Sequence, residues 1–258
     1  MRRVDTAAKQ GEEMRNWFLA LVVILVPMLV CAQDTASKPT TNAAALADPT
    51  VPAPKQAAIF FEKHKAILER GKQPATVLFI GDSITERWQK DGAKVWPHYD
   101  QYQAADFGIG GDRTQHVLWR IANGELDVIK PKVTVLMIGT NNLRYGEPDK
   151  ISEAIEMIVK QIREKTGSKV LLLGIFPRGA DPTKDEVKMF RGKIAKINER
   201  IAKLDDKKDI KYLDIGSAFL EKDGTISKEV MKDGLHPTEE GYKRWVDAMQ
   251  PALDEMLK

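Results

Sequence analysis

The stretch that decides the fold is TVLFIGDSIT, residues 76–85. Its first half is a short run of apolar and β-branched residues, which is typical of a buried strand. Its second half is a polar turn that begins with a glycine. Because ligands of open parallel sheets bind where the strands end, a turn of this kind is placed for chemistry. The stretch therefore predicts a buried strand that leads into a functional loop.

The rest of the chain alternates strands and helices in the same way. Four further apolar runs predict strands at residues 103–107, 133–138, 169–173 and 210–213. Amphipathic patterns predict helices at residues 57–70, 114–123, 149–165, 183–204 and 239–257. Nearly continuous apolar strands separated by helices are typical of a parallel sheet that is covered on both faces. We therefore predict an α/β fold, namely a three-layer α/β/α sandwich with a five-stranded parallel sheet.

Polar, glycine-rich segments follow the predicted strands. They are GDSIT at 81–85, GIGGD at 108–112, GTNN at 139–142 and GIFPRG at 174–179, and a late loop, DGLHP, covers 233–237. Since the carboxyl ends of parallel strands share one edge of the sheet, we expect these segments to converge there. Each one alone has a simpler explanation, such as a helix cap at Asp82 or Ser83. Their combination predicts the active site of an enzyme.

Composition and motif spacing exclude several classes of function. The 258 residues include 43% hydrophobic and 30% charged residues and carry a formal net charge of +3, so nothing directs the chain to nucleic acid. Arg113 stands where a dinucleotide-binding fingerprint needs its third glycine. The histidines His64, His98, His116 and His236 lack the paired spacing of metal ligands. We expect neither a metal nor a cofactor.

The loop that contains His236 suggests a specific chemistry. Asp233 precedes His236 by three residues, a spacing at which a carboxylate can hydrogen-bond one imidazole nitrogen while the other nitrogen faces outward. A histidine oriented in this way is what a serine nucleophile requires. His64 and His116 lie in predicted helices, so a structural or solvent-facing role is expected for both.

Together these motifs resemble the SGNH or GDSL hydrolases, and within them the group of the catalytic subunits of intracellular platelet-activating-factor acetylhydrolase. The resemblance covers about residues 75–242. Six blocks carry it in one order: FIGDS at 79–83, FGIGGD at 107–112, HVLWR at 116–120, GTNN at 139–142, PRG at 177–179 and DGLH at 233–236. It implies the flavodoxin-like sandwich of the SGNH hydrolases and an esterase activity.

The resemblance also implies roles for individual residues. Ser83 would be the nucleophile, and Asp233 and His236 would complete a catalytic triad. The backbone N–H groups of Ser83 and Gly111 and the side-chain amide of Asn141 would form an oxyanion hole, a set of donors aimed at the charge that develops on the substrate oxygen.

Five neighbouring residues receive weaker expectations. Ile84, Thr140 and Leu235 each adjoin a site residue, so we expect them to crowd the acyl pocket and to favour acetyl or other short acyl chains. Asp112 is expected to brace the glycine-rich loop, and Arg178 to pair with a carboxylate at the rim of the site.

The first 55 residues differ from the rest of the chain. Residues 16–30, NWFLALVVILVPMLV, follow a basic residue and predict a signal peptide over residues 1–32. This apolar stretch is shorter than the roughly 20 residues of a membrane span. A lipoprotein acylated at Cys31, the single cysteine, and an uncleaved anchor are the alternatives. Residues 33–55 are rich in Ala, Thr and Pro and predict a linker, so the hydrolase domain is expected at 56–258.

The sequence thus predicts a secreted or periplasmic serine esterase that works through an acyl-serine intermediate. Its substrate would be a small-molecule, carbohydrate or lipid ester, with no nucleic-acid partner and with membrane contact only through an uncleaved signal. Two alternatives stay open: a secreted carbohydrate- or lipid-binding module on the same fold without turnover, and an envelope-attached scaffold. The oligomeric state and the natural ester are not predicted.

Overall fold

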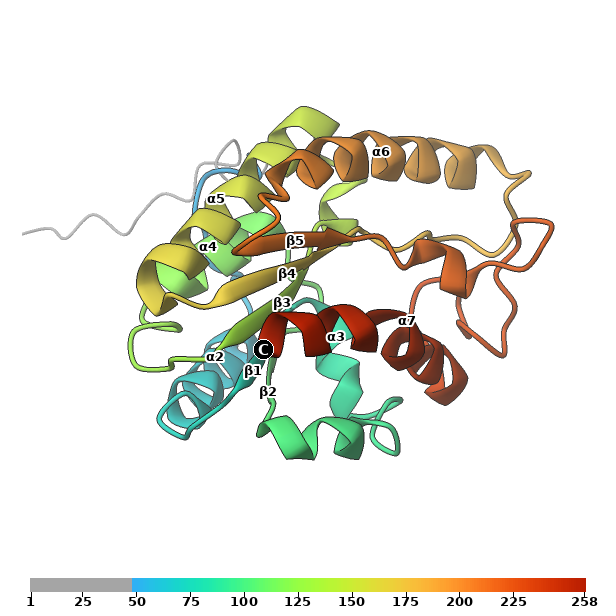
Figure 1. Ribbon diagram of the computed structural model, residues 1–258. Helices are drawn as coiled ribbons and strands as arrows, with labels where there is room; N and C mark the ends of the chain where they lie inside the picture. The colour runs from blue at the N-terminus through green and yellow to red at the C-terminus, as the bar shows by residue number, and fades with distance from the viewer. Residues whose placement is uncertain (1–47) are drawn as a thin grey trace, which may run out of the picture. The chain divides into compact units, whose positions relative to one another are not determined.

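The computed structural model describes residues 48–258, so the predicted signal peptide and most of the predicted linker lie outside the described residues. A five-stranded parallel sheet forms the centre, with strand order β2-β1-β3-β4-β5 (Figure 1). The strands are β1 (Val77–Gly81), β2 (Ala105–Gly108), β3 (Val133–Met137), β4 (Lys169–Leu173) and β5 (Ile210–Leu213). Gly81 at the end of β1 pairs with Gly108 and with Met137, so three strands end at the same level.

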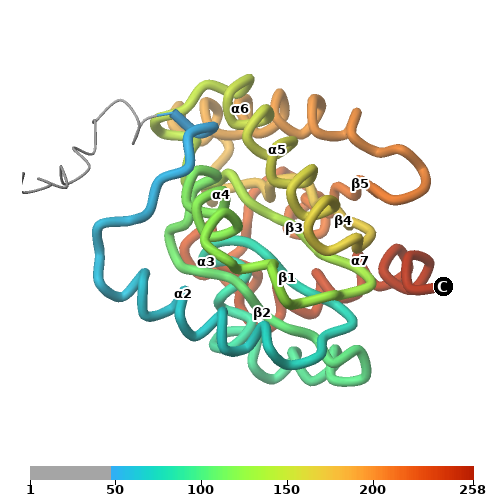
Figure 2. Tube along the Cα trace, turned by 90° about the vertical axis from the view of Figure 1, so that its left-hand side faces the viewer, coloured from blue at the N-terminus to red at the C-terminus, as the bar shows by residue number. Residues whose placement is uncertain are grey.

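Helices cover both faces of this sheet, which confirms the predicted three-layer sandwich (Figures 1 and 2). One face carries α2 (Ala58–Arg70), α4 (Thr114–Ala122), α5 (Pro148–Thr166) and α6 (Asp185–Ile201). The other face carries α3 (Ser83–Glu86) and α7 (Glu239–Leu257). All five predicted strands and all five predicted helices are present.

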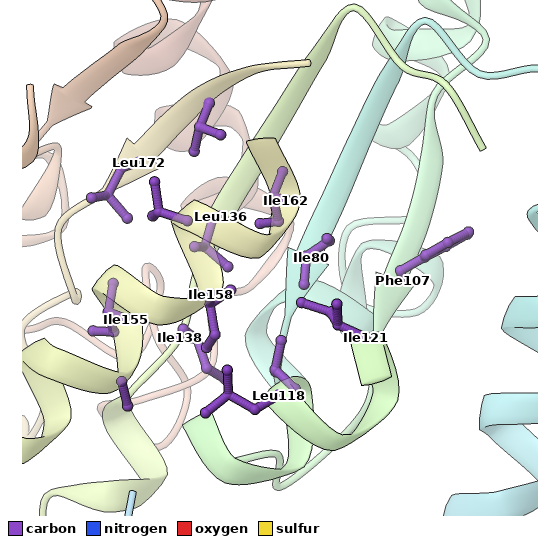
Figure 3. Packing of buried hydrophobic residues seen from close by; sticks show 14 of the residues in the cluster. Ile80, Phe107, Leu118, Ile121, Leu136, Ile138, Ile155, Ile158, Ile162 and Leu172 are labelled. Carbon is purple, nitrogen blue, oxygen red and sulfur yellow. The ribbon is translucent and has the colours of Figure 1, made fainter. Parts of the chain in front are cut away.

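The alternation of side chains along β1 divides the interior into two cores. Leu78 and Ile80 belong to the core beneath α2, α4, α5 and α6, whereas Val77 and Phe79 belong to the core beneath α3 and α7. Figure 3 shows Ile80 beside Ile121 of α4, with the isoleucines of α5 packed over the neighbouring strands. Because both faces are buried, each strand reads as a continuous apolar run. Each large side chain buried in this way stabilises the fold by about 1.5–3 kcal/mol.

The second core contains an aromatic segment that the sequence analysis left unassigned. Residues 87–102, which connect α3 to β2, contribute Trp88 and Tyr99, and both are fully buried. Trp88 packs against Tyr242 and Trp245 of α7, with ring centroids 4.3 and 5.0 Å apart. The hydroxyl of Tyr242 also donates a hydrogen bond of 2.7 Å to the carbonyl of Ile84. Helix α7 is therefore tied directly to the turn that contains Ser83.

The ends of some elements differ from the prediction for local reasons. Strand β2 begins at Ala105 and not at residue 103, because Gln103 has a left-handed backbone with φ of 48° that a strand cannot contain. The helix predicted over 183–204 begins only at Asp185, and its last residues, Ala202–Leu204, form a 3-10 turn. Such tightening is common at helix ends.

The last eight residues of the predicted linker are described by the structure and are bonded to the domain. Residues Asp48–Lys55, called here the N-terminal arm, pack against the start of α4. The N–H of Ala53 donates to the carbonyl of Gln115 at 3.1 Å, and the hydroxyl of Thr114 donates to the carbonyl of Pro49 at 2.9 Å. These long-range bonds order a segment whose composition alone predicts no structure. Within residues 48–258, no helix is long and apolar enough to cross a membrane.

Candidate active site

The first turn of the site depends on two glycines at the ends of neighbouring strands. A Cβ atom at Gly81 would collide with the side chain of Thr85 and would lie 2.6 Å from the carbonyl oxygen of Met137. A Cβ atom at Gly108 would lie 2.8 Å from the Cα of Glu86. Only hydrogen atoms fit at these positions, so α3 can approach the strand ends closely. Ser83, the first residue of α3, is therefore held at the carboxyl edge of the sheet.

Ser83 and His236 are in direct contact although 153 residues separate them. Ser83 Oγ lies 2.9 Å from His236 Nε2. The preceding residue, Asp82, caps α3 by accepting a hydrogen bond of 2.9 Å from the N–H of Ile84. Asp82 is fully buried, and this burial raises the pKa of its carboxyl to about 7, although the bond from Ile84 opposes the rise.

Asp233 holds the opposite side of the imidazole ring. Its Oδ2 lies 2.6 Å from His236 Nδ1, and its Oδ1 accepts hydrogen bonds from the N–H groups of Leu235 and His236. Partial burial tends to raise the pKa of Asp233, but the hydrogen bonds from the ring and backbone of His236 outweigh it and lower the pKa to about 2. The carboxylate therefore stays ionised at neutral pH.

A bond to a neighbouring loop fixes the position of the histidine loop. The N–H of Gly179 donates a hydrogen bond of 2.7 Å to the carbonyl of Gly234. The segments GIFPRG and DGLHP, which the sequence predicted at one edge, thus meet directly.

The glycine-rich loop after β2 lies beside Ser83. A Cβ atom at Gly110 would lie 3.8 Å from the Cβ of Ser83, which shows how close this loop is to the hydroxyl. Gly111 follows with φ of 74°, a backbone conformation that favours glycine. Among the described residues, neither the N–H of Gly111 nor the N–H of Ser83 has an acceptor. Both donors are available to a ligand.

Asn141 joins the third loop of the site to the glycine-rich loop. Its Nδ2 donates a hydrogen bond of 2.8 Å to the carbonyl of Asp112. An amide nitrogen carries two hydrogens, so one remains for another acceptor. The structure therefore brings together Ser83, Asp233 and His236 directly, and it places the loops of Gly111 and Asn141 next to them.

Two of the three residues expected to crowd the acyl pocket are instead buried. Ile84 is 1% exposed and packs in the core beneath α3 and α7. Thr140 is 1% exposed, and its carbonyl accepts a hydrogen bond of 3.1 Å from Arg178. Chain adjacency to a site residue was the reason for both predictions, but a side chain that follows Ser83 in a helix turns toward the core. Leu235 is only half-buried and stays a candidate for the pocket wall.

Arg178 does not have the role expected of it. Within residues 48–258 its guanidinium forms no ion pair with a carboxylate; it donates to the carbonyl of Thr140 and lies 4.6 Å from the centre of the Phe190 ring. Desolvation lowers the pKa of Arg178 from its ordinary value. It serves as a link between the loop after β3 and helix α6.

A buried charge cluster beneath the glycine-rich loop escaped the sequence analysis. Arg120 is fully buried, and its guanidinium lies 3.0 Å from Asp112 and 2.9 Å from Glu125. It also donates a hydrogen bond of 2.8 Å to the carbonyl of Phe107 in β2. Burial raises the pKa of Glu125 to about 7, although Arg120 lowers it. Asp112 thus braces the loop as expected. The sequence feature that could have indicated the buried role of Arg120 is its place, as a charged residue, on the apolar face of a predicted helix.

The two helical histidines have the structural roles predicted for them. Burial lowers the pKa of His116 to about 3, so its ring is neutral, and its Nδ1 accepts a hydrogen bond of 2.9 Å from the N–H of Arg113. His64 is buried with its pKa lowered by desolvation, and its Nε2 contacts the carbonyl of Asn123 at 3.1 Å. In the part of the chain that the structure describes, no group of three potential ligands could hold a metal ion.

A serine, a histidine and an aspartate in hydrogen-bond contact at the edge of an α/β/α sandwich define the class of serine hydrolases. Comparison with known proteins narrows this class. Residues 79–244 match the GDSL-like lipase/acylhydrolase family, and the chain belongs to this family. It is a carboxylic ester hydrolase.

Curated relatives support the assignment. The chain is 35% identical over 200 residues to platelet-activating factor acetylhydrolase IB subunit alpha2 of Rattus norvegicus, which covers 76% of this chain and 84% of the relative. The corresponding protein of Gallus gallus is 38% identical over 193 residues, with 73% and 80% covered.

Solved structures share the fold. A GDSL-like lipase from Bacteroides thetaiotaomicron superposes with a TM-score of 0.62 at 22% identity, covering 76% of this chain and 97% of that one. Axe2, an acetylxylan esterase from Geobacillus stearothermophilus, superposes with a TM-score of 0.55 at 18% identity, with 72% and 96% covered.

Proposed function

We propose that the protein is a secreted serine esterase that hydrolyses short-chain acyl esters, acetyl esters above all, through an acyl-serine intermediate. The observation that carries the proposal is the continuous line from Ser83 Oγ through the ring of His236 to Asp233, with contacts of 2.9 and 2.6 Å. These are the distances at which a base can take the proton of a hydroxyl while a carboxylate orients it.

In the proposed mechanism, Ser83 Oγ attacks the ester carbonyl as its proton passes to His236 Nε2. Asp233, bonded to Nδ1, keeps the basic electron pair on Nε2 and stabilises the imidazolium that forms. The tetrahedral intermediate collapses to an acyl-serine when the protonated histidine gives its proton to the leaving alcohol. A water molecule, deprotonated by the same nitrogen, then attacks the acyl group, and the collapse of the second intermediate releases the acid and restores the hydroxyl.

The negative charge on the substrate oxygen needs donors that are in place before the reaction. We assign this role to the N–H groups of Ser83 and Gly111, which have no acceptor among the described residues, and to the second amide hydrogen of Asn141. The hydrogen bond between Asn141 and the carbonyl of Asp112 joins two of the three loops that carry these donors.

Acyl preference provides the first test of this function. The names of two relatives, acetylhydrolase and acetylxylan esterase, support a preference for a small acyl group, and Leu235 is the one predicted pocket residue that is not fully buried. We expect kcat/KM for p-nitrophenyl esters to fall at least tenfold from acetyl to octanoyl. Leu235→Ala is expected to reduce this ratio severalfold, since one methylene in an apolar pocket is worth about 1–3 kcal/mol. Equal rates for both esters would contradict the acetyl preference, and an unchanged ratio in the variant would exclude Leu235 from the pocket.

Export is the second part of the proposal and rests on the apolar stretch at residues 16–30. N-terminal sequencing of the protein recovered from the periplasm or the medium of a bacterial host is expected to begin at Gln33. Recovery in the cytoplasm with Met1 retained would contradict export. A blocked N-terminus at Cys31 in the membrane fraction would instead identify a lipoprotein.

A further inference from the structure

We infer that Lys55, in the N-terminal arm, is a positioning residue that strengthens one donor of the oxyanion hole. The inference rests on the proposed function, because it concerns the N–H of Gly111. Lys55 Nζ donates a hydrogen bond of 2.5 Å to the carbonyl of Gly110 and lies 2.7 Å from Asp112 Oδ1. These two contacts lie on either side of Gly111 in the chain.

The carbonyl of Gly110 and the N–H of Gly111 belong to the same peptide group. A cation bonded to the carbonyl oxygen draws electron density toward that oxygen and leaves the N–H more positive, so the two hydrogen bonds reinforce each other. The effect grows in a site shielded from water, and the side chain of Lys55 is only 19% exposed. The ammonium thus polarises the amide group that faces the reacting oxygen.

Bonds on both sides of Gly110 restrict the orientation of this peptide group. The N–H of Gly110, in the preceding peptide group, donates a hydrogen bond of 3.1 Å to Glu86 Oε2, and the carbonyl of Gly110 is held by Lys55. Since Gly111 has the conformational freedom of a glycine, a loop without these bonds could rotate its N–H away from the substrate. Lys55 therefore contributes both direction and polarity.

Loss of Lys55 should leave the fold intact. Asp112 keeps its second cation, Arg120, at 3.0 Å, so the variant does not bury an unpaired carboxylate. The hydrogen bonds that hold the arm at Ala53 and Pro49 are also independent of the lysine side chain. A defect in Lys55 variants can thus be separated from unfolding.

The chain offers a closely matched control. Lys193 is 21% exposed, and its Nζ likewise pins a loop by donating to the carbonyls of Leu143 and Gly146 at 3.1 and 3.0 Å. Neither carbonyl belongs to a peptide group whose N–H is assigned to the oxyanion hole. Lys193→Met removes the same charge and the same kind of bond without the proposed polarisation.

The experiment compares kcat, KM and melting temperature for p-nitrophenyl acetate hydrolysis in the wild type, Lys55→Met, Lys55→Arg and Lys193→Met. We expect Lys55→Met to lower kcat about tenfold with KM changed less than twofold, because the N–H of Gly111 binds the substrate oxygen most strongly when that oxygen is charged in the transition state. Removal of a whole donor, as in Asn141→Ala, sets the upper limit at about 10²–10³. Lys55→Arg should recover most of the rate, and Lys193→Met should retain that of the wild type.

Three results would overturn the inference. The first is equal kcat for Lys55→Met and Lys193→Met, and the second is a rise in KM of Lys55→Met with kcat unchanged. The third is no recovery of kcat in Lys55→Arg while its melting temperature equals that of the wild type. Ser83→Ala, assayed in parallel, tests the proposed esterase function separately from the role of Lys55. If that variant keeps its activity, the proposed function falls and the role of Lys55 falls with it. If only the Lys55 result fails, the esterase mechanism stands.

Discussion

Ser83→Ala is expected to lower kcat for p-nitrophenyl acetate by about 10⁴ or more while leaving the melting temperature within about 2 °C of the wild type. The substitution removes the hydroxyl oxygen that lies in hydrogen-bond contact with His236 Nε2, at 2.9 Å. What remains is the rate supported by the oxyanion donors and by binding, which in comparable enzymes lies far below the full rate. Initial rates under saturating substrate and a thermal melt provide the measurement.

A second serine offers the control for this prediction. Ser152 is buried in α5, where its hydroxyl donates to the carbonyl of Pro148 at 2.8 Å. Ser152→Ala should keep kcat and can lower stability by about 1 kcal/mol through the lost hydrogen bond. Activity of Ser83→Ala within tenfold of the wild type would refute the assignment of the nucleophile.

Arg120→Met is expected to lower the free energy of unfolding by about 3–5 kcal/mol, the cost of leaving a buried carboxylate, that of Glu125, without its cation. Asp112 and Glu125 are both fully buried, and both lie within 3.0 Å of the guanidinium. Methionine fills a similar volume but cannot compensate either carboxylate. Against a total stability of about 5–15 kcal/mol, this loss is large, and urea denaturation at neutral pH measures it.

The matched control is Arg200→Met on α6. Arg200 pairs with Asp149 at 2.9 Å, but both side chains are largely exposed. Exposed pairs contribute about 0–1 kcal/mol, so this variant should unfold near the urea midpoint of the wild type. Equal midpoints for Arg120→Met and Arg200→Met would show that the cluster around Arg120 does not stabilise the fold.

The sheet could be predicted from sequence because its strands are buried on both faces. A run such as VLFIG at 77–81 is short and apolar throughout, which favours a strand in the middle of a sandwich, and the helices between the runs have clear amphipathic periods. Strand ends were less certain, since the left-handed turn at Gln103 depends on packing that the local sequence does not encode.

The part of the candidate site that lies in short sequence motifs could be predicted. GDS and DGLH carry turn and spacing information, so the convergence of Ser83, Asp233 and His236 could be inferred before any coordinates. The burial of Ile84 and Thr140 could not be predicted, because a residue next to a site residue in the chain can point either to the site or to the core.

The contacts of two cations were the main features that the sequence analysis missed. Lys55 meets Gly110 from a segment with the composition of a spacer, and Arg120 meets Glu125 across a helix end. Neither pairing leaves a periodic pattern, and the free energy that selects it comes from burial in the folded chain.

The hydrogen bond from Tyr242 to the carbonyl of Ile84 closes a small ring that runs from Ser83 through Ile84 to Tyr242, back along the chain to His236, and across to Ser83. The distance between the hydroxyl of Ser83 and the imidazole of His236 is thereby fixed by contacts within this ring, and the strands are not part of the ring. Insertions in the exposed turn at residues 221–223, which lies outside this ring, are therefore expected to leave the distance between the reacting pair unchanged. A scaffold of this kind can lengthen its surface loops without rebuilding its chemistry.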